Sequence, residues 1–232
     1  GLIVAIFETK YYRSNKPEDA AASRFWIKVF TATFALGVAT GITMEFSFGT
    51  NWADYARFVG DIFGAPLAAE ALLAFFLESV FLGVLLFGRK KVGKKFYLAS
   101  AWLVWFGSCL SALWIIIANS WMQTPAGAEL SADGTQAILT DFIAAAFNAT
   151  TIPRYLHTVD ALLIMGAFMA LAIGAWYLKK GRHTEFALRT VRVASCVALV
   201  TTVLMVAFAH QSAVVVAEEQ PTKFAMMEGA YE

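Results

Sequence analysis

Residues 65–88 read APLAAEALLAFFLESVFLGVLLFG, an apolar run interrupted by only two acids. A helix of about 20 apolar residues, rising 1.5 Å per residue, is long enough to cross the hydrocarbon core of a bilayer. The run therefore predicts a membrane-spanning helix. Its two acids, Glu70 and Glu78, are notable because ionisable groups at membrane depth are costly and are seldom present there without a role.

The rest of the chain has the same character. Of its 232 residues, 59% are hydrophobic and 15% are charged, whereas a soluble domain carries about 25% charged residues. We predict an all-α fold, a polytopic transmembrane helical bundle that forms a single domain over residues 1–232. Five complete spans and the tail of an earlier one are expected, at residues 1–12 (the tail), 25–48, 65–88, 96–121, 155–178 and 191–216.

Two features of the chain as a whole set further expectations. It opens with Gly1 inside an apolar run and without an initiator Met, so we expect a fragment whose natural N-terminus lies upstream. Its net charge of +1 gives no sign of nucleic-acid binding, and no such partner is expected.

Lysine and arginine separate into two groups along the predicted spans. Only Arg57, Arg154 and Lys223 fall on one side of the membrane. Because short cytoplasmic loops are enriched in Lys and Arg, the side with the larger group is predicted to be the cytoplasm. That group comprises Lys10, Arg13, Lys16, Arg24, Lys28, Arg89, Lys90, Lys91, Lys94, Lys95, Lys179, Lys180, Arg182, Arg189 and Arg192.

Two segments are predicted to lie on the extracytoplasmic side. Residues 124–154 form a long connection, in which residues 140–147 are too short to span and predict a short interfacial helix capped by Thr140 or Asp141. Residues 217–232 leave the membrane on the same side and mix charged, proline and methionine residues. They are either a surface loop or a site for an amphipathic ligand.

The depth of the two glutamates suggests what they do. Glu70 lies roughly 8 Å and Glu78 roughly 20 Å below the outer surface, and a regular helix separates them by about 80°, so they share one broad face. Ser79 is adjacent to Glu78, and Ser111 on the next span reaches a depth between the two acids. The pattern favours a proton-transfer route. The alternatives are structural hydrogen bonds between helices and, for the serines, bonds to their own helix.

His157 stands at the outer end of the fifth span. Imidazole is a common axial ligand of haem iron, and a histidine at a helix end is also a common capping or interfacial residue. Asp160, on the same face, either orients the imidazole as a hydrogen-bond acceptor or pairs elsewhere. His210, at the outer end of the last span, is a weaker candidate, and neither its role nor that of Asp160 follows from the sequence.

Several stretches resemble subunit I of the cytochrome bd quinol oxidases. They include GVATGITMEF (residues 37–46), and the closing residues 220–229 resemble the start of the family's quinol-binding Q-loop. The resemblance extends over essentially the whole chain, in the family's order. The other matching stretches are residues 48–52, 59–67, 75–79, 111–114, 119–123 and 157–159.

The resemblance implies a respiratory terminal oxidase that oxidises ubiquinol or menaquinol and reduces dioxygen to water with a low-spin haem b, a high-spin haem b and a haem d. It matches His157 to an axial ligand of the low-spin haem b, and Lys223 and Glu228 to residues implicated in quinol oxidation. The proton path and the surroundings of the oxygen-site haems are matched to Glu70, Glu78, Ser79 and Ser111.

The implied setting is the bacterial cytoplasmic (inner) membrane, with lipid around the spans and subunit II, or also small accessory subunits, as partners. The remaining haem ligands are expected outside residues 1–232. The alternatives are a proton-coupled membrane transporter, a haem-variant (cyanide-insensitive) relative with haem b only, and a non-catalytic relative. The choices between haem d and haem b at the oxygen site and between the two quinols, and the length of the Q-loop, stay open.

Overall fold

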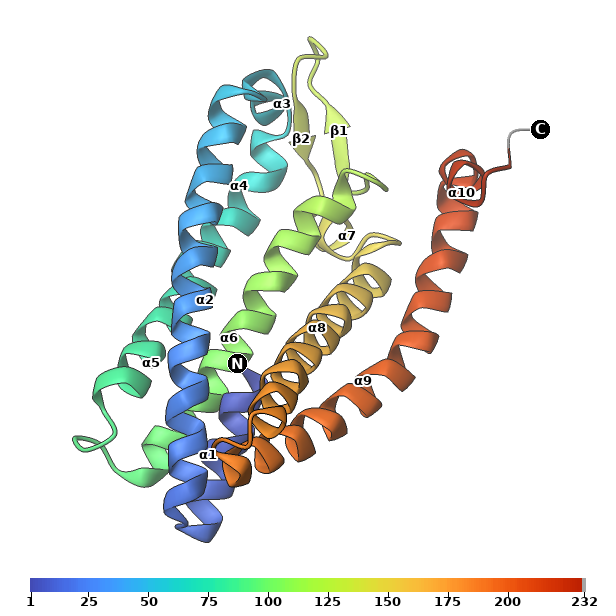
Figure 1. Ribbon diagram of the computed structural model, residues 1–232. Helices are drawn as coiled ribbons and strands as arrows, with labels where there is room; N and C mark the ends of the chain where they lie inside the picture. The colour runs from blue at the N-terminus through green and yellow to red at the C-terminus, as the bar shows by residue number, and fades with distance from the viewer. Residues whose placement is uncertain (231–232) are drawn as a thin grey trace.

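Long helices run side by side through the molecule (Figure 1). A computed structural model describes residues 1–230, and within them five helical stretches are long and apolar enough to cross a membrane. A shorter helix, α1 (Leu2–Ser14), precedes them. The predicted all-α bundle with five spans is confirmed. The spans are α2 (Pro17–Thr50), the continuous α4 (Gly60–Ala69), η1 (Glu70–Phe75) and α5 (Phe76–Phe87), then α6 (Lys94–Trp121), α8 (Thr151–Lys179) and α9 (Thr184–Glu219).

The helices extend beyond the apolar runs that predict them. α2 begins at Pro17, whereas its apolar run begins at residue 25. Proline suits the first turn of a helix, where a backbone N–H has no intrahelical partner, and the acids Glu18 and Asp19 interact favourably with the positive end of the helix dipole. The polar first turns of α2 therefore extend this helix beyond the apolar run from which the span was predicted.

Short elements gather at the end of the bundle opposite the α8–α9 turn (Figure 1). Between α6 and α8 the chain forms an antiparallel hairpin, with Ala128 opposite Leu139, that the sequence did not predict. The short helix α7 follows the hairpin. The Asp141 carboxylate caps α7 by accepting hydrogen bonds from the N–H groups of Ile143 (2.9 Å) and Ala144 (3.1 Å). Residues 217–219 continue α9. The short elements are α3 (Ala53–Phe58), β1 (Ala128–Leu130), β2 (Ala137–Leu139), α7 (Phe142–Ala146) and α10 (Pro221–Glu228).

The hairpin turn is held by one aspartate. The Asp133 carboxylate accepts hydrogen bonds from the hydroxyls of Ser131 (2.6 Å) and Thr135 (2.8 Å). These bonds favour the ionised carboxylate, and they lower the pKa of Asp133 to about 2. The next residue, Gly134, has φ 70°, a conformation that glycine adopts without steric cost.

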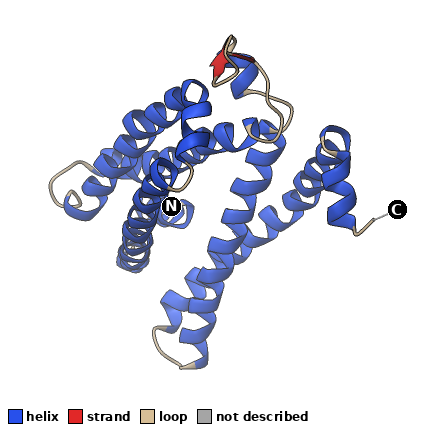
Figure 2. Cartoon of the chain, turned by 90° about the horizontal axis from the view of Figure 1, so that it is seen from above, coloured by secondary structure: helices blue, strands red, loops and turns tan. Residues whose placement is uncertain are grey.

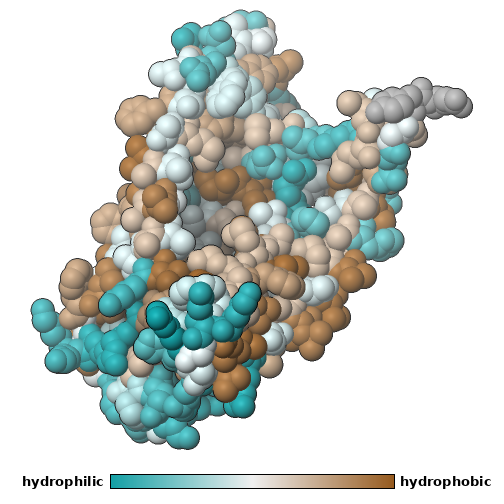
Figure 3. Space-filling model, viewed as in Figure 1, coloured by the Kyte–Doolittle hydropathy of each residue, from teal (hydrophilic) through white to brown (hydrophobic). Residues whose placement is uncertain are grey.

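The opposite end of the bundle holds the α1–α2, α5–α6 and α8–α9 connections, where hydrophilic residues gather in Figure 3. These connections carry the basic residues that the sequence assigns to the cytoplasm. The largest buried apolar cluster lies toward this end, where Phe7 of α1, Trp26 of α2 and Tyr97 of α6 pack together. The bundle is therefore best packed next to its basic end.

Helices α8 and α9 pack closely at the basic end. A Cβ at Gly174 of α8 would lie 2.8 Å from the Val191 Cγ2 of α9, so glycine is what allows the two backbones to approach. Toward its other end α9 leans away from the bundle, and α10 stands at its tip, apart from the other helices in both views (Figures 1 and 2).

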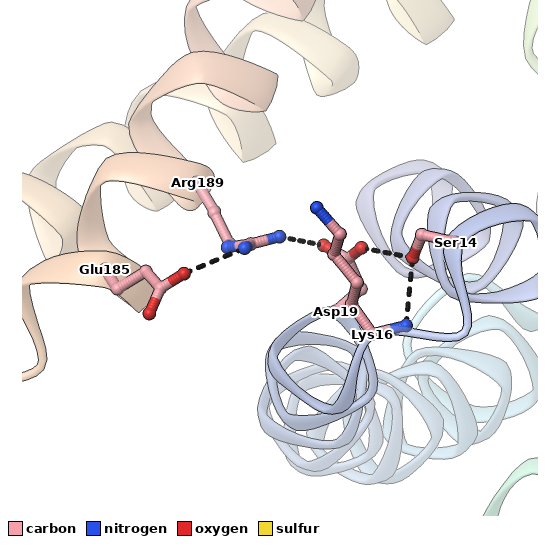
Figure 4. A network of polar contacts seen from close by, with 5 residues as sticks. All are labelled: Ser14, Lys16, Asp19, Glu185 and Arg189. Atoms are coloured by element: carbon pink, nitrogen blue, oxygen red, sulfur yellow. Dashed lines mark hydrogen bonds and ion pairs between the residues drawn. The ribbon is translucent and has the colours of Figure 1, made fainter.

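Two polar clusters tie the helices together at the basic end. The buried Glu8 of α1 accepts hydrogen bonds from Ser23 of α2 and from Arg89, which follows α5. In the second cluster Arg189 of α9 donates to Asp19 of α2 (2.7 Å) and to Glu185 (2.8 Å). Figure 4 shows that Asp19 also accepts from Ser14, at the end of α1 (2.7 Å). Together they connect α1, α2, α9 and the turn after α5.

Replacing Glu8 with alanine is expected to destabilise the protein by about 3–5 kcal/mol, because it leaves a largely buried arginine charge without its partner. The Glu8 side chain is 3% exposed and that of Arg89 21% exposed. Thermal unfolding of the purified full complex measures the effect. Glu185→Ala is the control, because its side chain is 67% exposed and such pairs contribute about 0–1 kcal/mol. Equal unfolding temperatures for the two variants would contradict the assignment.

Candidate functional site

The helix that carries Glu70 and Glu78 is not regular. A π-helical turn, η1, begins at Glu70 and ends at Phe75, so the prediction that the two acids lie about 80° apart on a regular helix is wrong. A π turn accommodates one extra residue, about 100° of rotation, which reduces the separation to about 20°. The two carboxyl groups therefore lie almost in line along one face.

Both acids receive a hydrogen bond from a serine of the neighbouring span. The Ser111 hydroxyl donates to Glu70 Oε1 (2.8 Å), and the Ser108 hydroxyl donates to Glu78 Oε1. Ser108 and Ser111 are three residues apart on α6, which places them on one side of that helix. The result is two carboxyl–hydroxyl pairs, one above the other, between the same two helices.

A glycine sets how closely these helices approach at Glu78. A Cβ at Gly107 of α6 would lie 2.7 Å from Glu78 Cγ, which is shorter than any normal contact between carbon atoms. Glu78 is accordingly buried, with 7% of its surface exposed, although its helix lies at the side of the bundle in Figure 1. The close approach of α6 accounts for the burial of this residue.

The structure modifies the predicted roles of the serines. Ser79 donates to the carbonyl of Phe76 (3.2 Å) on its own helix and contacts neither acid by a hydrogen bond among residues 1–230. Ser108, which the sequence analysis did not select, is the partner of Glu78. The signal that identifies it is its position, one helical turn before Ser111.

An open cleft of ≈ 440 Å³ lies beside the two pairs, between α2, the η1–α5 helix and α6. Glu70, Glu78 and Ser111 line it, together with a third acid, Glu45 of α2, which the sequence analysis did not single out as a site residue. A Cβ at Gly37, which also lines the cleft, would meet nothing within 4 Å. Most of the remaining lining is apolar, so the cleft suits a large apolar group held next to carboxyl groups.

His157 lies nearly two turns inside α8 and forms no hydrogen bond with residues 1–230. Its Nδ1 is buried without a partner. Among the described residues, α6 and α8 carry five more buried polar atoms without partners: Trp114 Nε1, Ser120 Oγ, Thr151 Oγ1, Arg154 Nε and Asp160 Oδ2. Asp160, 4% exposed, therefore does not orient the imidazole by a direct hydrogen bond. Buried polar atoms nearly always have a hydrogen-bond partner. These unpartnered atoms are therefore suited to binding a polar group of a ligand. The uncommitted imidazole fits an axial ligand of haem iron.

Lys223 and Glu228 lie on α10, at the end opposite the basic connections. The Lys223 ammonium donates to Gln123 Oε1 (2.7 Å), just after α6, and Gln220 donates to the Gln123 carbonyl (2.8 Å). Glu228 is exposed at the end of α10. Among the described residues no hydrogen bond or ion pair joins either side chain to His157.

The fold and the site together define a class: a polytopic integral membrane protein with hydrogen-bonded carboxyl groups inside its spans and an uncommitted histidine at one end. The sequence model of the family described as "Cytochrome bd terminal oxidase subunit I" matches residues 1–232. The chain belongs to this family.

Relatives agree with the family match. The chain is 47% identical over 230 residues to cytochrome bd-II ubiquinol oxidase subunit 1 of Escherichia coli (strain K12), covering 99% of this chain and 45% of that protein. It is 40% identical over 230 residues to cytochrome bd ubiquinol oxidase subunit 1 of Bacillus subtilis (strain 168), covering 99% and 49%.

A solved structure has the same fold. The bd oxidase of Geobacillus thermodenitrificans matches with a TM-score of 0.93 and 29% sequence identity, over 100% of this chain and 53% of that one. The chain spans about half the length of the curated relatives it matches.

Proposed function

We propose that this chain is part of subunit I of a respiratory terminal oxidase that oxidises membrane quinol and reduces dioxygen to water. The observation that carries the proposal is the pairing of two intramembrane carboxyl groups with serine hydroxyls beside a cleft, in a chain of this family. Two quinols give two quinones, four protons and four electrons, and dioxygen takes up four of each to form two waters.

Within this proposal His157 would hold the iron of the low-spin haem b. The cleft lined by Glu45, Glu70 and Glu78 would border the high-spin haem b and haem d. When bound, the haems supply the one-electron carriers between quinol and dioxygen and the place where dioxygen binds. The names of the relatives include both ubiquinol and, for a putative oxidase subunit of Bacillus subtilis that is 24% identical, menaquinol; either quinol is a substrate candidate.

The carboxyl–hydroxyl pairs form the proton route. A serine hydroxyl both donates and accepts, so Ser108 and Ser111 can each pass a proton to or from the acid that they contact. The two serines are one turn apart, about 4.5 Å along the helix, a gap that a single water can bridge. Ser79 is the residue after Glu78 but donates to the Phe76 carbonyl of its own helix, so we propose for it only a supporting place beside the path.

The proposed sidedness follows from the two ends of the bundle. The basic connections face the cytoplasm of a bacterium, and α10 faces outward with Lys223 and Glu228 next to the bound quinol. The carboxylate of Glu228 accepts a quinol proton, and Lys223, held by Gln123, donates to a quinol oxygen. Protons leave outside and are taken up inside, which builds a membrane potential. Subunit II, small accessory subunits and membrane lipid are the proposed partners.

A dithionite-reduced minus oxidised spectrum of membranes containing the full-length subunit with its partner subunit tests the function. The proposal predicts bands of both haem b and haem d, and quinol-dependent uptake of dioxygen. Bands of haem b alone would indicate the haem-variant relative. A folded complex with no haem would instead support a proton-coupled transporter, in which the same glutamates carry the protons.

Replacing Ser108 or Ser111 with alanine is expected to slow dioxygen uptake by roughly tenfold. This is less than the ~10²-fold or more for loss of a positioned proton carrier, because a water can occupy part of the space. Haem content should not change. Ser100→Ala is the matched control, since this buried serine of α6 donates only to the Phe96 carbonyl of its own helix (2.8 Å). If all three variants turned over like the wild type, the route would not pass through these hydroxyls.

A further inference from the structure

A second cleft opens at the basic end of the bundle, far from α10. It has a volume of ≈ 440 Å³ and lies between the first turns of α2, the end of α5 and the start of α6. Five cations line it: Arg24, Lys28, Arg89, Lys90 and Lys91.

The charges of this cleft are not balanced by the protein. No carboxylate is part of its lining. The buried acid Glu8 pairs with Arg89 and accepts from Ser23, which neutralises one of the five charges. Among the described residues the other four cations have no ion-pair partner within 4.0 Å. A concave surface with one sign of charge attracts ligands of the opposite sign.

The other wall of the cleft is apolar. Ile27 and Leu85 are buried there, and the Tyr97 hydroxyl donates to the Leu85 carbonyl (2.6 Å), which fixes this wall. Leu86 and Phe87, at the end of α5, are exposed large apolar side chains that continue from the cleft along the spanning helix. A ligand that matches both walls has an anionic head and a hydrocarbon body.

We propose that this cleft binds an anionic phospholipid, with its phosphate among the cations and an acyl chain along Leu86 and Phe87. The cleft lies where the spans end, which is the depth of lipid headgroups, and basic pockets between spans on this side of a membrane suit such headgroups. Free phosphate would use only half of the lining. The site is independent of the proposed oxidase chemistry, since none of its residues belongs to the proton route or the haem site.

The test uses the full complex, stripped of lipid in a non-ionic detergent and titrated with phosphatidylglycerol, phosphatidylcholine or inorganic phosphate. Thermal unfolding and native mass spectrometry measure stabilisation and bound lipid. The variant is Lys28→Gln/Lys90→Gln/Lys91→Gln, which leaves Arg89 in its structural pair. The matched control, Lys179→Gln/Lys180→Gln/Arg182→Gln, removes three exposed charges from the α8–α9 turn at the same end of the bundle.

Phosphatidylglycerol is expected to stabilise the wild type and the control at the same concentration. A basic residue near anionic lipid contributes about fivefold in affinity, so the cleft variant should need on the order of a hundredfold more lipid. Three outcomes would overturn the proposal. The cleft variant could titrate like the control, phosphatidylcholine could stabilise as well as phosphatidylglycerol, or inorganic phosphate alone could produce the whole shift, which would make the ligand a phosphate.

Discussion

Replacing His157 with alanine is expected to abolish the low-spin haem b band while leaving the other haem bands in place. The imidazole forms no hydrogen bond with residues 1–230 and has a buried Nδ1 without a partner, so its removal breaks no described polar contact. Without the axial imidazole the iron loses a strong-field ligand and the low-spin spectrum with it. Dioxygen uptake driven by quinol should fall to near zero, because the proposed electron path then lacks the haem that His157 would hold.

The control for this experiment is His210→Ala. His210 lies in the half of α9 away from the basic end, and it is exposed, so its replacement removes an imidazole without touching the proposed ligand. Both variants are purified as the full complex, and reduced-minus-oxidised spectra are recorded together with unfolding temperatures. A low-spin band that survives in the His157 variant and disappears in the His210 variant would move the ligand to α9.

The second large effect is expected from Glu78→Gln. Glutamine has the same shape and its amide oxygen can still accept from Ser108, so folding and haem content should be preserved, but the amide cannot carry a proton. Loss of a positioned proton carrier costs about 10²-fold or more in rate. We therefore expect dioxygen uptake to fall by about that factor, and the charge-separating step to slow with it.

Electrometric recording on proteoliposomes measures this step directly. Glu45→Gln is the comparison, because Glu45 lines the same cleft but lies on α2 and has no serine partner among the described hydrogen bonds. A smaller effect at Glu45 would support a route along the α5–α6 contact. If the Glu78→Gln variant generated the same membrane potential as the wild type, the proposed proton route would be wrong.

The sequence was sufficient to predict the membrane-spanning helices, because their hydropathy is summed over many residues. Apolar length and the separation of basic from other loops predict five spans, and all five are present. The hairpin of β1 and β2 was missed because three-residue strands are too short to show a reliable alternation. The π turn at Glu70 was missed because it depends on packing against α6, which hydropathy does not describe.

The sequence predicted only part of the site. Glu70, Glu78 and His157 can be identified one residue at a time, because an acid or an imidazole in an apolar run is rare. Ser108 does not, because serine is common in spans, and only the approach of α6 at Gly107 brings its hydroxyl to Glu78. Contacts between helices therefore decided which of several serines is the partner.

The two polar clusters hold four parts of the chain together at the basic end. Glu8 with Arg89, and Asp19 with Arg189, join α1, α2, α9 and the turn after α5 at one end, while α9 leans outward at the other (Figure 1). At the other end Gln220 and Lys223 donate hydrogen bonds to Gln123, just after α6. Separating α9 from α6 at that end therefore breaks hydrogen bonds, whereas separating helices at the basic end breaks buried ion pairs.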